Sequence, residues 1–439
     1  MPNSAHLEFD TSDKRVANRI HKLRSSPVRD LFSAATRPDV ISLSGGMPDV
    51  SLIPQDAIRT AVDAVVNNDE LRAIALQYGS TDGALGMKKV VCSLMRDIGV
   101  RCNPEQVFLT TGAQEALSLI AKTFLNPGDI VITEGPTYLT AISAFAAYEP
   151  EILTVPFDDD GMRVDLLEEL LKKLGKNNPK LKFVYTIPNF QNPGGVTMSD
   201  ERRHKLIELS NEYKFMLLED DPYGRLRYKG GHQVPLKAMD SKVVYLGTIS
   251  KTMAPGLRVG WIVAPKHVLS NINLVKQGTD LCCSSFDQAV VEHYFTDTNW
   301  QKVLQDFIKV YSERCDAMLD ALEEFFPPEA EWTHPEGGFF VWVTLPEYVD
   351  TGSMLAEALD AGVTYVPGDS FYPGGREGKN SMRINFSYES PENIREAIRR
   401  LAEVIESRLE LYRVFIEAGV IKEDESPSNE HVSAGAQEE

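Results

Sequence analysis

The sequence predicts an α/β fold, with a mainly parallel sheet between helices and a second, smaller α+β domain. Two observations carry this prediction. From about residue 40, short apolar runs alternate with amphipathic stretches, which is the pattern of strands and helices in a parallel sheet. After about residue 300 this alternation ends and a long amphipathic stretch follows. A chain of 439 residues is long enough for a large core and for more than one domain.

Six short apolar runs are the strand candidates of the larger part, and helical stretches separate them. After Gly112, apolar residues recur at helical spacing, which predicts a helix. The turn residues Asn-Pro-Gly-Asp at 126–129 end that helix. The strand candidates lie at residues 107–110, 130–133, 183–186, 216–219, 243–246 and 259–264.

The smaller part is expected to begin with an amphipathic helix at about residues 300–326. A strand at 337–343, a helix, a Gly/Pro-rich loop, a strand at 381–386 and a last helix to about residue 418 follow. The first 40 residues are polar and arginine-rich, and we expect an ordered arm or a short helix there. The expected division is an arm with part of the small domain at 1–45, a large domain at 46–310, a small domain at 311–418 and a disordered acidic tail at 419–439.

The charge and the apolar content exclude several classes of function. The chain has 45 basic and 64 acidic side chains and a net charge of −19, so its surface should repel nucleic acid and anionic membranes. No apolar run approaches the length of a membrane-spanning helix, and the first residues lack the apolar stretch of a signal peptide. We expect a cytoplasmic protein that binds neither DNA nor membranes.

The cysteines carry no signal for a metal or a disulfide framework. There are five, an odd number, scattered along the chain without the Cys/His spacing of a zinc site. Reduced thiols and no bound metal are therefore expected.

The segment at residues 247–261, Gly-Thr-Ile-Ser-Lys-Thr-Met-Ala-Pro-Gly-Leu-Arg-Val-Gly-Trp, carries the strongest chemical signal. Lys251 follows an apolar strand and lies among Thr248, Ser250 and Arg258. Two hydroxyls and a guanidinium suit a phosphate dianion, since a guanidinium meets phosphate through two parallel hydrogen bonds. A lysine beside a bound phosphate can condense with an aldehyde on the same ligand. Taken alone, a lysine after a strand is more often a solvated surface residue.

This segment resembles the Schiff-base motif of the class I and II aminotransferases, enzymes of fold type I that depend on pyridoxal phosphate (PLP). In that motif Ser-x-Ser-Lys is followed seven residues later by Arg-x-Gly, and Thr248 here replaces the first serine. The resemblance covers about residues 15–415. The arm and the run Glu-Asp-Asp-Pro-Tyr at 219–223 are most similar to the 2-aminoadipate/kynurenine aminotransferase subgroup. The resemblance implies the PLP-transferase fold, a seven-stranded sheet in the large domain and a Schiff base on Lys251.

The resemblance also implies which residues bind PLP. The carboxylate of Asp220 ends a buried strand, which is costly without a charged partner, and the protonated ring nitrogen of the cofactor would supply one. Asp221 is the alternative, but the three-residue step to Tyr223 fits Asp220. Tyr223 would hydrogen-bond the phenolic oxygen of PLP, and Lys251, Asp220 and Tyr223 form the catalytic set. The remaining cofactor residues are Gly112, Ala113 and Gln114 at a helix start, Tyr138 on the ring, Asn192 on the phenolic oxygen, Thr248, Ser250 and Arg258 at the phosphate, and Tyr78 reaching the phosphate of a neighbouring subunit.

Substrate recognition is assigned by the same resemblance. Arg383, in Ser-Met-Arg-Ile-Asn-Phe, would clamp the α-carboxylate of the substrate, and Gly46 and Asn192 would lie beside it. Ser26 and Arg29 in the arm would recognise the side chain, with Arg29 as the candidate for a distal carboxylate. A surface arginine in a helix is the alternative for Arg29. The role of Tyr78 implies a homodimer with composite sites.

The sequence therefore predicts a PLP-dependent aminotransferase. It would move the amino group of an L-amino acid (2-aminoadipate, glutamate, or an aromatic or branched one) to a 2-oxo acid such as 2-oxoglutarate by ping-pong chemistry through Lys251. A PLP-dependent β-lyase or another amino-acid-transforming enzyme is the alternative, because the same fold hosts these reactions. A transcription regulator is disfavoured, since no DNA-binding module precedes the catalytic part and the chain is acidic.

Overall fold

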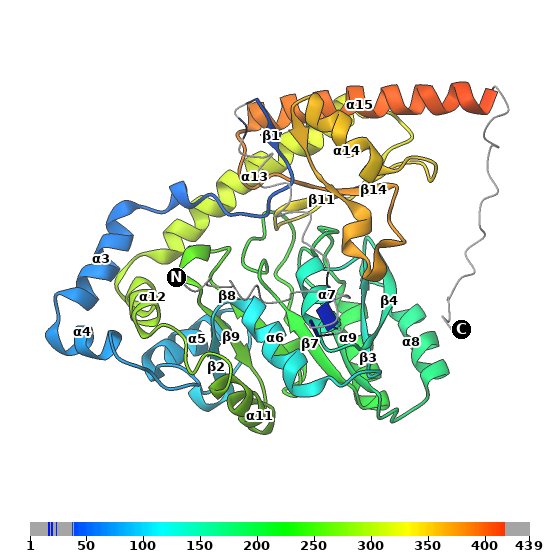
Figure 1. Ribbon diagram of the computed structural model, residues 1–439. Coiled ribbons are helices and arrows are strands. Elements are labelled where there is room, and N and C mark those ends of the chain that lie inside the picture. The colour runs from blue at the N-terminus through cyan, green and yellow to red at the C-terminus, as the bar shows by residue number, and fades with distance from the viewer. Residues whose placement is uncertain (1–15, 18, 21–22, 24–36, 38, 418–439) are drawn as a thin grey trace, which may run out of the picture.

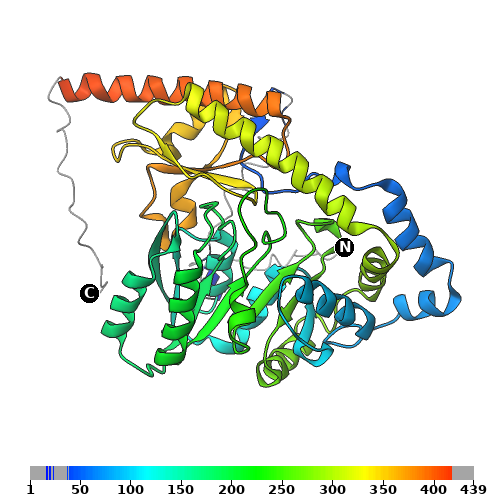
Figure 2. The same ribbon diagram turned by 180° about the vertical axis from the view of Figure 1, so that it is seen from behind.

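The computed structural model describes residues 16–17, 19–20, 23, 37 and 39–417. Their strands form an eight-stranded sheet, a four-stranded sheet and a two-stranded pair. Figure 1 shows helices around the eight-stranded sheet, and the four-stranded sheet beside the long helices α13 (Trp300–Phe325) and α15 (Pro391–Glu417). Figure 2 shows the same two sheets and their helices from behind.

Residues 55–297 form the large sheet and the helices around it. The strands are β2 (Val107–Thr110), β3 (Ile130–Gly135), β4 (Glu151–Asp158), β5 (Gly161–Met162), β6 (Leu181–Thr186), β7 (Met216–Asp220), β8 (Val244–Thr248) and β9 (Gly260–Val263). The helices are α3 (Gln55–Val66), α4 (Asp69–Ala75), α5 (Leu85–Asp97), α6 (Ala113–Phe124), α7 (Leu139–Ala146), α8 (Val164–Leu174), α9 (Asp200–Tyr213), α10 (Leu236–Met239), α11 (Lys266–Gln277) and α12 (Ser285–Asp297).

The large sheet is mainly parallel, as the sequence predicts. Its strand order is β2-β9-β8-β7-β6-β3-β4-β5. Neighbouring strands from β8 to β4 run parallel, and β9 runs antiparallel to both β8 and β2. The six predicted strands are β2, β3, β6, β7, β8 and β9, with ends within two residues of the prediction.

Helices cover both faces of this sheet, so the central strands are apolar on both sides. In β3, Ile130 and Ile132 pack into a cluster with Leu167 of α8. Val131 between them points to the opposite face and packs with Leu117 of α6. This alternation follows from the two-residue period of a strand.

Sequence periodicity missed β4, which pairs parallel with β3. Its side chains are mostly half-exposed, and it contains Pro156, so it lacks the continuous apolar run that marks the central strands. The two-residue β5 pairs antiparallel with β4 and adds an eighth strand at the edge, where the resemblance implied seven.

The four-stranded sheet is antiparallel in the order β10 (Glu331–Trp332), β11 (Phe340–Thr344), β14 (Ser381–Asn385) and β13 (Val366–Pro367). Helices α13, α14 (Thr351–Asp360) and α15 contribute to its core. The predicted strand at 337–343 begins only at Phe340. The reason is that Gly338 adopts a positive φ of 71° and a Cβ on Gly337 would lie 2.3 Å from the carbonyl oxygen of Leu226.

The segment at residues 41–49 joins the N-terminal part of the chain to the small sheet region. Strand β1 (Ile41–Ser42) pairs with β12 (Val363–Thr364), and Arg314 of α13 binds Asp49 at 2.8 Å. The domain boundaries at residues 45, 310 and 418 stay predictions. Most of the arm and the predicted tail at 419–439 lie outside the described residues.

Two general features concern membranes and thiols. Among the described residues, no helix is both long and apolar enough to cross a membrane. All five cysteines lie in this part of the chain and have free thiols, although the sulfurs of Cys92 and Cys102 are 3.7 Å apart. Burial raises the pKa of both thiols, to about 12 for Cys102.

Candidate active site

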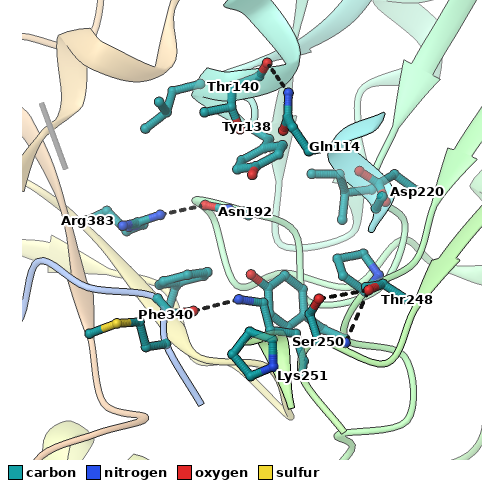
Figure 3. A pocket seen from close by; sticks show the side chains of 18 of the residues that line it. Gln114, Tyr138, Thr140, Asn192, Asp220, Thr248, Ser250, Lys251, Phe340 and Arg383 are labelled. Carbon is teal, nitrogen blue, oxygen red and sulfur yellow. Dashed lines mark hydrogen bonds between the residues drawn. The ribbon is translucent and has the colours of Figure 1, made fainter. Parts of the chain in front are cut away.

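A cavity of about 420 Å³ lies where the carboxyl ends of β7 and β8 meet the start of α6 and the small sheet. Strand ends of this kind are the usual ligand sites of parallel α/β sheets. Figure 3 shows polar side chains from both sheets pointing into the same space. The lining residues are Gly46, Met47, Ala113, Gln114, Tyr138, Leu139, Thr140, Ile187, Asn192, Asp220, Pro222, Tyr223, Thr248, Ser250, Lys251, Pro255, Arg258, Phe340 and Arg383.

Lys251 enters the cavity from the turn after β8. Its amine donates a hydrogen bond to the carbonyl oxygen of Gly46 at 2.6 Å, and lies 5.9 Å and 5.8 Å from the ring centroids of Tyr223 and Phe339. Burial, together with the charges of Arg383 and Arg258, lowers the pKa of Lys251 to about 8. An amine with this pKa is partly unprotonated at neutral pH, so it can act as a nucleophile or a base.

Asp220 ends β7 and faces the cavity with one free oxygen. Its Oδ2 accepts a hydrogen bond from the hydroxyl of Tyr185 at 2.7 Å, whereas Oδ1 is buried and has no partner among the described residues. Burial raises the pKa of Asp220 to about 7. The hydrogen bond from Tyr185 lowers this pKa, but its effect is smaller than that of burial. A buried, unpaired carboxylate oxygen is costly, so this atom suits a ligand that brings a donor or a positive charge.

Asp221, the alternative in the sequence, faces elsewhere. Its Oδ1 accepts from Asn189 at 2.9 Å and from the amide of Gly224 at 3.0 Å, and its Oδ2 accepts from Tyr245 at 3.0 Å. All these contacts fix the loop that follows β7. The carboxylate of Asp220 therefore lies at the cavity, whereas the carboxylate of Asp221, one residue later, stabilises the loop.

The start of α6 and the turn after β8 form a cradle of helix amides, hydroxyls and a guanidinium. The first amides of a helix have no acceptor within the helix, and its positive dipole end favours an anion. Thr248 Oγ1 lies 2.9 Å from Ser250 Oγ, and Arg258 Nη2 donates to the carbonyl of Thr111 at 3.3 Å. A Cβ on Gly112 would lie 2.2 Å from Arg258 Nη2, so only glycine allows this approach.

Arg383 reaches the cavity from β14 of the small sheet. It is 3% exposed, and its guanidinium lies 4.1 Å from the ring centroid of Phe340. Nη1 donates to Asn192 Oδ1 at 3.0 Å, and Nη2 donates to the carbonyls of Ser44 at 2.9 Å and Gly45 at 3.2 Å. Burial lowers the pKa of Arg383 to about 10, which leaves it charged at neutral pH.

Two further predicted residues are aromatic side chains on the cavity wall. Tyr138 caps the start of α7, and Tyr223 lies in the turn after β7, where its ring packs edge-on against Phe339 and Phe340. Burial raises the pKa of both phenols, so both hydroxyls are protonated at neutral pH and able to donate.

Two of the remaining predicted residues, Gly112 and Tyr78, do not line this cavity. Gly112 is the N-cap residue of α6, one position before Ala113, which lines the cavity. Tyr78 is 81% exposed on the surface and does not line the cavity of its own chain. Ser26 and Arg29 lie outside the described residues.

Sequence patterns missed several residues at or behind the cavity. Met47, Leu139 and Phe340 supply apolar wall, and no motif marks them. Tyr185 and Glu134 are fully buried behind Asp220 and Asn192, where Glu134 accepts from Gln191 at 3.2 Å. In the sequence both belong to apolar strands, so only the pairing of β3, β6 and β7 reveals that they lie near the site.

The donors around the cavity fit PLP. A cradle of hydroxyls, helix amides and a guanidinium matches a phosphate dianion, and the unpartnered Asp220 Oδ1 matches a protonated ring nitrogen. Lys251 lines the same cavity and can meet an aldehyde on the bound ligand.

Comparison with known proteins agrees with this geometry. The family profile for "Aminotransferase class I and II" matches residues 38–401. Aromatic-amino-acid aminotransferase 1 of Thermococcus litoralis is 45% identical over 408 residues, covering 92% of this chain and 97% of that protein. The 2-aminoadipate transaminase of Thermus thermophilus is 35% identical, covering 89% and 96%.

A solved structure gives the same result. The kynurenine aminotransferase of Pyrococcus horikoshii, in complex with PMP, the amine form of the cofactor, is 43% identical with a TM-score of 0.86. The match covers 91% of this chain and 99% of that one. These relatives are all aminotransferases, and none of these findings favours the β-lyase alternative. The chain belongs to the class I and II aminotransferases and is a PLP-dependent aminotransferase of fold type I.

Proposed function

We propose that this cavity transfers the amino group of an L-amino acid to a 2-oxo acid, with Lys251 as the proton-transferring and cofactor-binding residue. One observation carries the proposal: the low-pKa amine of Lys251, the free Oδ1 of Asp220 and the guanidinium of Arg383 all line one cavity. Each group suits a different part of the cofactor–substrate pair.

The residues of the cradle would hold the phosphate of PLP. Ala113, Gln114, Thr248, Ser250 and Arg258 are the proposed phosphate ligands, with Gly112 allowing the close approach. When bound, PLP withdraws electrons from the α-carbon of the amino acid and makes its proton acidic.

Four other residues are proposed for the ring of the cofactor. Asp220 keeps the ring nitrogen protonated, because its free Oδ1 faces the cavity. Tyr138 contacts the ring face, and Asn192 and Tyr223 donate to the phenolic oxygen. Asn192 is suited to this because its Oδ1 is occupied by Arg383, which leaves the amide NH₂ to donate.

Lys251 moves a proton at its Nζ. With a pKa of about 8, a fraction of the amines is unprotonated at neutral pH, and each can accept the α-proton and return it to another atom. The hydrogen bond to the Gly46 carbonyl holds this amine at the segment that also binds Arg383.

Arg383 binds the α-carboxylate. It is charged, buried and stacked on Phe340, so it offers a rigid fork for two parallel hydrogen bonds. Its Nε has no partner among the described residues, which leaves one donor free in addition to those shared with backbone carbonyls. Gly46 lies beside it and leaves space for the carboxylate.

An aromatic or other apolar amino acid is the proposed donor, and 2-oxoglutarate is the proposed acceptor. The walls formed by Met47, Leu139 and Phe340 support an apolar side chain. The similar proteins act on aromatic amino acids, kynurenine and 2-aminoadipate by name. Selection of a distal carboxylate by Arg29 and Ser26 stays a prediction, because both residues lie outside the described part of the chain.

A homodimer with composite sites is part of the proposal. Ile74, Leu76, Tyr78 and Leu85 are each more than half exposed within one stretch of chain around the end of α4. Such apolar surface suits association with a second copy, and it would carry Tyr78 to the partner's phosphate. A cytoplasmic location also stays a prediction.

The test follows the two half-reactions by the visible absorption of the bound cofactor. We expect the absorption to change when L-phenylalanine, L-2-aminoadipate or L-glutamate is added alone, and to return when 2-oxoglutarate is added. Lys251→Ala should bind PLP yet fail this exchange. An S-alkyl-L-cysteine, which carries a leaving group on its β-carbon, is added in a separate assay. Release of pyruvate, ammonia and the thiol from it without any oxo acid would instead indicate lyase chemistry, and a protein that takes up no PLP would contradict the proposal.

A further inference from the structure

Tyr185 is a buried tyrosine that does not line the cavity. It lies on β6, its side chain is fully buried, and its hydroxyl donates to Asp220 Oδ2 at 2.7 Å. Any effect of Tyr185 on the reaction must therefore pass through Asp220.

The contact makes the two oxygens of Asp220 unequal. Oδ2 is occupied by Tyr185, and Oδ1 is buried without a partner among the described residues. A carboxylate held at one oxygen cannot rotate freely, so the hydrogen bond fixes which oxygen faces the cavity. The pairing depends on the parallel register of β6 and β7, in which Tyr185 lies beside Leu218.

Packing holds Tyr185 in this position. Its ring meets Phe145 of α7 edge-on, with 5.5 Å between ring centroids, inside a cluster that includes Phe183 and Leu218. The hydroxyl is thus the one polar atom of a side chain whose ring belongs to the apolar core.

We propose that Tyr185 is a positioning residue, which binds Asp220 Oδ2 so that Oδ1 is presented to the ring nitrogen of PLP. The inference rests on the role proposed above for Asp220. It concerns cofactor affinity and the charge of Asp220, and it does not require Tyr185 to touch PLP or substrate.

The charges around Asp220 show why a donor is needed there. Glu134 of β3 and the adjacent Asp221 both raise the pKa of Asp220, in addition to burial, and the hydrogen bond from Tyr185 lowers it. Tyr138 and Tyr223, two further titratable groups that interact with Asp220, are neutral at neutral pH. Without the Tyr185 hydroxyl, more of Asp220 would be protonated near pH 7, and a neutral carboxyl cannot pair with a positive ring nitrogen.

The test is the Kd for PLP of Tyr185→Phe as a function of pH. Full-length holoenzyme is dialysed against buffers of known PLP concentration, and the bound fraction is read from the visible absorption. At about pH 7 we expect the Kd to rise about tenfold or more, the size expected for a lost hydrogen bond to a charged group. The difference from the wild type should shrink as the pH is raised and Asp220 ionises in both proteins.

Tyr294→Phe is the matched control. Tyr294 of α12 is 1% exposed, and its hydroxyl has no hydrogen-bond partner in the described structure. Both substitutions remove one buried hydroxyl and keep the ring. Tyr294→Phe should leave the Kd for PLP and its pH dependence unchanged, and melting curves of both variants establish that they fold.

Asp220→Asn and the double variant separate this inference from the proposed function. If Asp220→Asn binds PLP as tightly as the wild type, the proposed role of Asp220 is wrong. If Asp220→Asn weakens binding but Tyr185→Phe does not, only the inference about Tyr185 is overturned. We expect Tyr185→Phe to have little effect in the Asp220→Asn background, and an undiminished effect there would show that Tyr185 acts by another route.

Discussion

The amine of Lys251 donates to the carbonyl oxygen of Gly46 at 2.6 Å, although the two residues are 205 positions apart. Arg383 binds the same segment through the carbonyls of Ser44 and Gly45. The segment is fixed in turn by the ion pair between Asp49 and Arg314 of α13. One short stretch of backbone therefore contacts two of the three cationic groups proposed to act on the cofactor and the substrate.

The lowered pKa of Lys251 predicts the pH dependence of cofactor capture. Condensation with an aldehyde requires the unprotonated amine, so the rate at which PLP-free enzyme captures PLP should rise with pH and level off above about pH 8. Stopped-flow absorption at a series of pH values measures this rate. N-acetyl-lysine amide, whose amine is unperturbed, should show no plateau until about pH 10.4. An enzyme profile that follows the free amine would contradict the environment described for Lys251.

Arg383→Lys should impair substrate binding more than cofactor binding. A lysine keeps the charge but loses the planar fork and the stacking on Phe340, and we expect kcat/KM to fall about a hundredfold, or ~3 kcal/mol. The Kd for PLP should change little. Arg395→Lys, in an exposed pair with Glu324 on the molecular surface, is the control and should leave kcat/KM unchanged. Equal losses in both variants would argue against a carboxylate clamp.

Gly112→Ala tests the anion-binding cradle against a backbone-matched control. Gly112 (φ 77°, ψ 169°) and Gly175 (φ 81°, ψ 153°) share a backbone conformation that is nearly restricted to glycine, so alanine at either position costs about 1–3 kcal/mol of stability. Only at Gly112 does the new Cβ meet Arg258, at 2.2 Å, whereas at Gly175 it meets nothing within 4 Å. We expect both variants to melt lower, and only Gly112→Ala to lose PLP affinity. Dialysis against PLP and melting curves measure the two effects, and equal PLP affinities would refute the cradle.

Three buried carboxyl groups predict how the stability of the PLP-free enzyme depends on pH. Burial raises the pKa of Glu134, Glu219 and Asp220 to about 7. In the unfolded chain these groups titrate near their ordinary values, so between about pH 4.5 and about pH 7 the folded protein binds more protons than the unfolded chain. Stability should therefore fall as the pH rises through this window, and melting temperatures across it measure the slope.

Variants assign the slope to these groups. Glu134→Gln does not ionise and should flatten the slope, whatever its effect on the melting temperature at one pH. Glu410→Gln on the exposed face of α15 is the control and should keep the slope. A melting temperature that rises between about pH 4.5 and about pH 7 would contradict the raised pKa values.

The sequence predicted the central strands well because their apolar runs reflect burial on both faces. The runs that became β2, β3, β6 and β7 needed no information from distant residues. It missed β4, whose half-exposed faces and Pro156 give no such run, and it began β11 three residues too early. The conformation of β4 depends on its pairing with β3, and the start of β11 depends on the packing of Gly337 and Gly338. Local composition indicates neither.

What the sequence determined by itself is the set of chemical groups near each strand end, such as Lys251 with Thr248 and Ser250 after β8. These residues are close in the chain, so a local motif is sufficient to recognise them. Only the tertiary structure decided that Tyr185 binds Asp220 and that Arg383 binds Asn192, 191 residues away. The reason is physical: contacts between strands depend on register and on the packing of the two sheets, and local sequence preferences constrain neither.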